Sequence, residues 1–190
     1  MKATSPLLSQ LLPLKSEPRQ DASKRSNVIG ANMVVVSELF DVVYGSNLEL
    51  NALVQDPNGV NFVSRTSKNN GVSAKVNLIE GEATIECPVL SVAGGGSVLE
   101  TFLQSEPFYS GRDLYILRPK MPMTNDELLF YCCCIRANRF RYIYGRQANR
   151  TLKQLMVPAM SAIPLWAYGG FDRVIGEVDA VVTQGATLAA

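Results

Sequence analysis

The strongest constraint on the fold is a helix start signal at Thr124. Glu127 follows three residues later, which is the spacing of a capping box, where a hydroxyl and a carboxylate each accept a hydrogen bond from a backbone N–H at the helix start. Apolar side chains then recur along one side of the segment. The pattern predicts a helix over residues 125–137, with a buried side made of Leu128, Leu129, Tyr131, Cys132 and Ile135.

This helix leads into a stretch that is basic, aromatic and rich in amides. Residues 136–153 hold six Arg or Lys residues and no acidic residue. The helix dipole gives Arg136 and Arg139 a purely structural explanation, but it does not account for the basic residues beyond them. The stretch favours double-stranded DNA as ligand, because cations bind phosphates and amides can read base edges. Its predicted DNA-binding residues are Arg139, Arg141, Tyr144, Arg146, Gln147, Asn149, Arg150 and Lys153.

A second basic segment lies earlier in the chain. The net charge is only +1, but residues 61–75 carry three basic residues and no acidic one, whereas residues 76–135 carry eight acidic and three basic residues. At physiological salt, charges more than about 8 Å apart are largely screened from each other. A ligand therefore feels the local charge of a segment rather than the net charge of the chain. A polar loop over residues 64–70 is expected between two strands, and a solvated hairpin loop is the alternative interpretation. From this part of the chain the predicted site takes Arg65, Lys68, Asn69, Asn70 and Arg112.

Most of the remaining chain reads as short strands separated by turn signals. A turn of helix capped by Ser37 is expected between two of the first strands, and residues 56–59 (Asp-Pro-Asn-Gly) predict a turn. Residues 94–96 are three glycines, but neither a P-loop nor a dinucleotide-binding pattern surrounds them, so a tight turn is expected. The expected strands are 42–44, 60–63, 72–76, 83–85, 89–93, 98–102, 102–104, 114–117 and 155–157, with a further short strand starting at Met33.

Histidine and cysteine usage narrows the chemistry. The absence of histidine excludes Ser-His-Asp and Cys-His catalysis and zinc sites of the Cys/His type. Cysteines 132–134 are consecutive, which fits neither a disulfide framework nor a metal knuckle and predicts small buried helix residues in a reducing cytoplasm. We therefore predict no catalytic residue, no metal site and no cofactor.

The composition predicts one domain with two tails. Prolines and polar residues predict a flexible arm over residues 1–30, followed by a domain over residues 31–166 and a tail over residues 167–190. No apolar run approaches the roughly 20 residues that span a bilayer. Pro6 and Pro13 interrupt the first apolar cluster, so we expect no secretory signal.

Three phrases of the sequence are similar to a known family. In order, NFVSRTSKNNGV, GGGSVLETFLQSEPFYSGRDLYILRPK and LLFYCCCIRANRFRYIYGRQANRTLKQLMVP resemble the target recognition domain of restriction-modification specificity subunits. The likeness is to type I systems and to the related type IIB and type IIG enzymes, and it covers roughly residues 33–166. FYSGRDLYIL and YGRQANRTLK are its most specific parts.

The resemblance implies a mixed α/β (α+β) domain with a curved, partly barrel-like sheet flanked by helices. It also implies that the protein reads one half of a split DNA target. The implied partner is a methyltransferase subunit that carries the S-adenosylmethionine chemistry. Complete specificity subunits resemble two such domains joined by long helices, whereas this chain resembles one, as a half subunit, a remnant or a stand-alone member. A homodimer and a restriction subunit stay open as further partners.

The residues discriminate between three candidate functions. In a DNA-reading module, Arg146, Arg150 and Lys153 are expected at phosphates and Arg65, Asn69, Asn70 and Gln147 near base edges, although the sequence does not separate these roles. A methyltransferase would need a glycine-rich nucleotide loop and an NPPY-like tetrapeptide, and the sequence has neither. A nuclease would need Glu-x-Lys after Asp56-Pro57, and this motif is also missing. A decoy that binds a methyltransferase subunit without reading DNA is the alternative.

Overall fold

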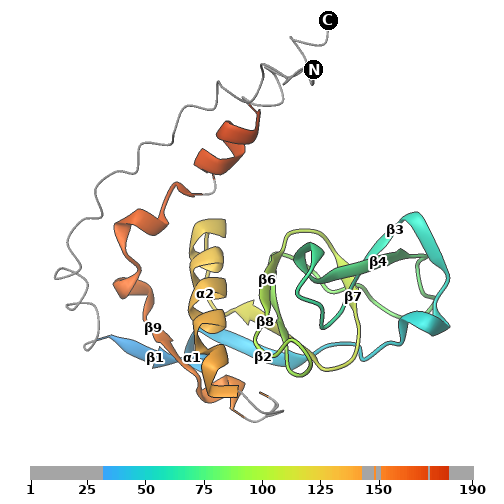
Figure 1. The fold of residues 1–190 in the computed structure, drawn as a ribbon, viewed down its shortest axis with the longest axis horizontal. Helices are drawn as coiled ribbons and strands as arrows, with labels where there is room; N and C mark the ends of the chain where they lie inside the picture. Colours follow the sequence, from blue (N-terminus) through green and yellow to red (C-terminus); the bar gives the residue numbers. More distant parts are fainter. Residues whose placement is uncertain (1–31, 143–147, 149–150, 171, 180–190) are drawn as a thin grey trace, which may run out of the picture. The chain divides into compact units, whose positions relative to one another are not determined.

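The computed structural model describes residues 32–142, 148, 151–170 and 172–179. The chain divides into two units, Met1–Ala31 and Asn32–Ala190, and the described residues all belong to the second (Figure 1). The arm expected over residues 1–30 therefore lies outside the described residues. Within the described ranges, no helix has the length and apolar character needed to cross a membrane.

A four-stranded antiparallel sheet is the centre of the described unit. One of its faces, which includes Phe40, Leu90 and Leu117, packs against the helix α2 (Asn125–Ala137) in the largest apolar cluster. Its other face, which includes Leu114 and Ile116, packs against a second sheet. In spatial order the strands are β2 (Phe40–Tyr44), β8 (Leu114–Pro119), β5 (Val89–Ala93) and β6 (Thr101–Gln104).

The second sheet contains both antiparallel and parallel pairs. Its order is β4 (Val72–Val76), β3 (Gln55–Val63) and β7 (Phe108–Ser110), with β3 and β7 parallel. Residues 56–59, where a turn is expected, lie inside β3 as an irregularity, because Gln55 and Val60 both pair with Val76 and the Asn58 N–H donates to Asp56 Oδ1 at 2.9 Å. A Cβ on Gly59 would lie 2.2 Å from the Val76 carbonyl oxygen, so this irregular strand requires glycine there.

The third sheet pairs segments from opposite ends of the described unit. β1 (Met33–Val35) runs antiparallel to β9 (Met156–Pro158), and the short helix α1 (Val36–Leu39) follows β1 directly. Its N-cap is Val35, so the expected cap at Ser37 is wrong. Figure 1 shows α2 between this pair and the strands β6 and β8.

The helix α2 begins and ends where the capping box and the apolar pattern predict. The Glu127 backbone N–H donates to Thr124 Oγ1 at 3.3 Å, and the Thr124 N–H donates to Glu127 Oε2 at 2.7 Å. Tyr131 is fully buried and meets Phe40 edge to face, with ring centroids 5.4 Å apart. The capping box therefore fixes where the helix begins, and the packing of Tyr131 on Phe40 fixes which side of it is buried.

The cysteines of α2 only partly match the expectation that they are buried. Cys132 is buried and Cys134 partly buried, but Cys133 is exposed. Burial raises the pKa of the Cys132 thiol to about 12, as expected for a thiol without water around it.

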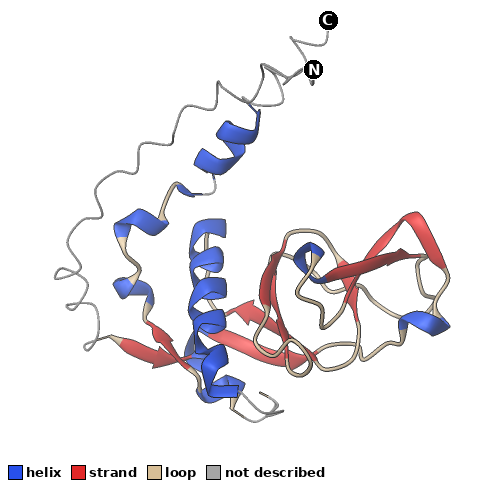
Figure 2. Ribbon diagram, in the orientation of Figure 1, coloured by secondary structure: helices blue, strands red, loops and turns tan. Residues whose placement is uncertain are grey.

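The mixed α/β prediction is confirmed, with the strands of the described residues in three sheets and no closed barrel (Figure 2). The strand expected at residues 83–85 is wrong, because only Ile85 pairs, in a single bridge to Phe108. β7 was not expected, and the strand expected to begin at Val98 begins at Thr101. Short 3₁₀ turns complete the unit: η3 (Leu50–Ala52), η4 (Asn69–Gly71), η5 (Asn138–Tyr142), η6 (Leu152–Gln154), η7 (Met160–Ala162) and η8 (Leu165–Ala167).

Candidate nucleic-acid interface

The carboxyl end of β5 joins three segments that are distant in the sequence. The Ala93 N–H donates to the Glu100 carbonyl at 2.9 Å, and the Gly94 N–H donates to the Asp113 carbonyl at 2.8 Å. The Ala148 N–H in turn donates to the Gly94 carbonyl at 3.0 Å. Main-chain hydrogen bonds therefore tie the loop before β8 and the basic stretch 136–153 to the same strand end.

The glycine turn at this strand end confirms the prediction of a tight turn. Leu99 N–H donates to the Ala93 carbonyl at 2.8 Å, and Gly96 has a φ of +66°, a value that favours glycine. A Cβ on Gly96 would lie 3.9 Å from the Arg65 Cβ. The turn thus brings the loop after β3 close to the end of β5.

Arg65 is held by a carboxylate from the loop before β8. Its Nη1 donates to Asp113 Oδ2 at 2.5 Å, with the Arg65 side chain 41% exposed. The Tyr44 hydroxyl donates to Asp113 Oδ1 at 2.9 Å and accepts from the Asp113 N–H at 2.8 Å. Partial desolvation, and then the hydrogen bond to Asp113, raises the pKa of the Tyr44 phenol, so the donor keeps its proton at neutral pH.

Two asparagines in the loop after β3 each donate one side-chain N–H to a main-chain carbonyl of a neighbouring strand. Asn69 and Asn70 have φ values of +47° and +53°. Asn69 Nδ2 donates to the Val72 carbonyl at 3.1 Å, and Asn70 Nδ2 donates to the Leu103 carbonyl at 2.9 Å. The predicted contact residues Asn69 and Asn70 therefore keep the loop on β4 and β6, while Lys68 lies exposed beside them.

Residues 138–142 bring the second basic segment to the same glycine turn. Gly96, Val98, Arg139, Phe140 and Tyr142 line a hollow of about 340 Å³. Phe140 is 66% exposed, and the Arg141 guanidinium carbon lies 5.8 Å from the centroid of its ring. Gly96 thus lies near Arg65 and lines the same hollow as Arg139.

A buried acid lies behind the second segment. Glu100 is 4% exposed and forms ion pairs with two arginines: Arg139, and Arg136 at 3.1 Å between Nε and Oε2. Arg136 also lies over the Phe102 ring, 5.9 Å from its centroid. Arg136 in α2 and Arg139 in η5 therefore neutralise the carboxylate of Glu100, which precedes β6, and about half of each arginine side chain stays exposed.

Five predicted contact residues lie outside the described residues: Tyr144, Arg146, Gln147, Asn149 and Arg150. Ala148, between them, is described and fully buried. It fixes one point of the basic stretch against Gly94.

Arg112 and Lys153 lie at different places. Arg112 forms an ion pair with Glu49 and lines a hollow of about 340 Å³ that Arg65, Ser64 and Ser73 also line.

Lys153 instead lines a hollow of about 430 Å³ together with Arg118, Lys120 and Asp41, by the opposite end of β8. The sequence did not lead us to predict Arg118 and Lys120 as DNA-binding residues. The available signal was their closeness in the chain, since the two basic residues flank Pro119.

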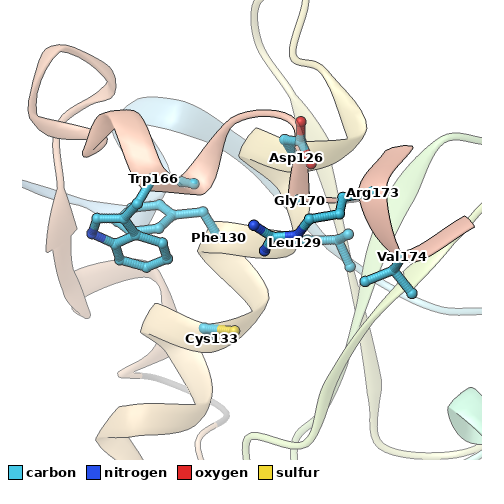
Figure 3. A pocket seen from close by; sticks show the side chains of 9 residues that line it. Asp126, Leu129, Phe130, Cys133, Trp166, Gly170, Arg173 and Val174 are labelled. Atoms are coloured by element: carbon cyan, nitrogen blue, oxygen red, sulfur yellow. The ribbon is translucent and has the colours of Figure 1, made fainter. Parts of the chain in front are cut away.

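An apolar hollow of about 370 Å³ lies on a different part of the unit, between α2 and residues 166–174 (Figure 3). Its walls include Leu129, Phe130, Cys133 and Trp166, with the Phe130 and Trp166 ring centroids 6.1 Å apart. This lining does not suit a polyanion. Among the described residues there is also no group of three or more acidic, cysteine or histidine side chains that could hold a metal ion.

No family model matches the chain. One curated protein that does match is the specificity subunit S.BcgI of a type II restriction enzyme from Heyndrickxia coagulans. It is 27% identical over 150 residues, which are 75% of this chain and 42% of that subunit. This chain therefore spans less than half the length of that relative.

Solved specificity subunits share the fold. The S subunit of a type I restriction-modification system from M. genitalium matches with a TM-score of 0.52 at 15% identity, over 83% of this chain and 45% of that one. The HsdS subunit from Thermoanaerobacter tengcongensis matches with a TM-score of 0.54 at 14% identity, over 91% and 41%. A chain from a study of type I system assembly matches with a TM-score of 0.53 over 82% and 39%. The predicted resemblance to a target recognition domain of specificity subunits is thus confirmed in sequence and in fold.

Proposed function

We propose that this protein is a sequence-specific DNA-binding module of a restriction-modification system. It reads one half of a split target and docks on a methyltransferase subunit, and it has no catalytic role of its own. The similarity to S.BcgI and to type I S subunits supports the role, and the grouping of basic segments at the end of β5 supports the mechanism.

One observation carries the proposal. Gly96 adjoins Arg65 from the first basic segment and lines a hollow with Arg139, Phe140 and Tyr142 from the second. Because both segments adjoin one turn, their cations act together on a single polyanion rather than on two separate ligands. The described Ala148 N–H also donates to the carbonyl of Gly94, at the same strand end.

The test is salt-dependent binding of the full chain to a fluorescent duplex, followed by anisotropy. Neutralising about six phosphates gives a slope of about −5 in a plot of log K against log salt concentration. The variant Arg141→Ala should reduce the slope by about one, and Arg139 is left in place because it neutralises the buried Glu100. Arg173→Ala serves as the matched control, because Arg173 lines the apolar hollow and should leave the slope unchanged. A binding constant that does not change with salt concentration contradicts the proposal.

The methyltransferase partner is tested separately. Co-purification of the full chain with a methyltransferase subunit is expected, together with DNA binding by the complex. Retained co-purification without any measurable DNA binding would instead favour the decoy function. A homodimer and a restriction subunit are further predictions of the same resemblance, and the cysteine usage predicts action in the cytoplasm.

A further inference from the structure

A chain of contacts runs from Tyr44 through Asp113 to Arg65, whose side chain stays 41% exposed. We propose that Arg65 reads a guanine, and that Asp113 and Tyr44 are positioning residues that fix the plane of its guanidinium group. This inference rests on the proposed function, and it separates the base-reading role from the phosphate-binding roles.

Asp113 is fixed before it meets Arg65. Its Oδ1 accepts from the Tyr44 hydroxyl, its N–H donates to the same hydroxyl, and its carbonyl accepts from the Gly94 N–H at 2.8 Å. Tyr44 is itself held edge to face against Tyr115, with ring centroids 5.2 Å apart. The carboxylate therefore presents Oδ2 to Arg65 from a set position, as a base-reading side chain requires.

Three other described cations at the interface, Arg112, Arg141 and Lys68, have charge without this positioning, whereas Arg139 is paired with the buried Glu100. Arg112 and Glu49 form an ion pair between side chains that are 60% and 47% exposed, which is the kind of pair that fixes little. Arg141 has only the Phe140 ring beside it among the described residues. Lys68 is exposed and carries a compact ammonium group, which suits a phosphate as a point charge.

The guanidinium of Arg65 has donors left for a base. One of its five N–H groups binds Asp113, and within the described ranges the others have no hydrogen-bond partner. A planar fork held by one edge can donate two parallel hydrogen bonds from another, and guanine offers O6 and N7 as a matching pair of acceptors in the major groove. Adenine offers a donor at the first of these positions, so the same fork discriminates against it.

The first test replaces Arg65 by lysine and selects bound sequences from a randomised duplex pool with the full chain. The wild type should enrich a motif in which one position prefers guanine by about 5- to 150-fold. Arg65→Lys keeps the charge but loses the fork, so this preference should disappear while the other positions and the salt slope stay the same. An unchanged guanine preference in this variant overturns the inference.

The second test replaces Asp113 by asparagine. Asparagine tolerates the left-handed backbone of this residue, whose φ is +52°, but it no longer pairs with Arg65 as an anion. The guanine preference should fall towards one, without a change in salt slope, which a merely structural role would not produce. Glu49→Gln is the matched control, because it removes the exposed acid beside Arg112 and should leave the motif intact.

The outcomes separate the two proposals. A wild-type chain that enriches no motif and binds without salt dependence contradicts the proposed function, and the inference falls with it. A wild-type motif that both Arg65→Lys and Asp113→Asn leave unchanged overturns only the inference. Should Asp113→Asn fail to fold, as seen by thermal melting, Arg65→Lys decides alone, because the Arg65 side chain is 41% exposed and its replacement leaves the core intact.

Discussion

The two ends of β8 are both basic, but they are built differently. Before its first residue, Asp113 receives hydrogen bonds from Tyr44 and Arg65 and fixes the arginine. Near its last residue, Arg118 and Lys153 line a hollow. Their side chains make no hydrogen bond or ion pair with any described residue. Lys120 there donates to the Ser37 carbonyl at 2.7 Å.

The comparison separates charge from positioning. Loose cations attract a phosphate backbone whatever its sequence, because a point charge needs no fixed orientation. A guanidinium held by a fixed carboxylate can favour one base over another, because hydrogen bonds to base edges need set directions. We therefore expect the Asp113 end of β8 to govern sequence preference, and the Arg118 end to govern affinity for DNA in general.

The largest effect is expected from the strand that connects the two ends. Leu117 is fully buried against α2, so Leu117→Ala should lower the free energy of unfolding by about 2–5 kcal/mol. Urea denaturation measures it. Val43→Ala on the neighbouring strand, where Val43 pairs with Ile116 and is partly exposed, is the control with a much smaller expected loss. Equal losses in the two variants would show that β8 is not the packed centre.

The next effect concerns the loose cations. The double variant Arg118→Ala/Lys153→Ala should weaken binding to all duplexes alike and reduce the salt slope by up to about two, since each phosphate contact contributes about one. The motif enriched from a randomised pool should stay the same. Loss of a preferred base in this variant would erase the distinction between the two ends. Anisotropy titrations at several salt concentrations supply the slope.

The smallest effect is expected from Tyr44→Phe. The change removes one hydroxyl that makes two hydrogen bonds with Asp113 and leaves the ring against Tyr115. We expect a loss of about 0.5–1.5 kcal/mol in unfolding free energy, and a guanine preference weaker than that of the wild type but stronger than that of Asp113→Asn. A preference equal to that of the wild type would show that Asp113 needs no support from the hydroxyl. The pool selection used for Asp113→Asn measures both variants side by side.

Local signals in the sequence predicted the parts of the fold that depend on neighbouring residues. The capping box at Thr124 and Glu127 gave the bounds of α2, and the three glycines at residues 94–96 form the expected tight turn. Both depend on contacts within a few residues, so a short stretch of sequence contains all of their determinants.

The parts that the sequence did not predict depend on distant contacts. Arg65 and Asp113 are 48 residues apart, and Arg139 and Glu100 are 39 apart, so neither pair has a local signature. β7 is three residues long and exists through its pairing with β3. Residues 56–59 carry strong turn chemistry, and the Asn58 N–H does donate to Asp56 Oδ1, but they form an irregularity inside β3, because Gln55 and Val60 on either side both pair with Val76 of β4.

The joints at the carboxyl end of β5 are made by peptide groups, with Gly94 bonded to both Asp113 and Ala148 through its main chain. Peptide hydrogen bonds hardly depend on which side chain a residue carries. Substitutions can therefore exchange the side chains around this strand end while the main-chain frame that presents them keeps its shape.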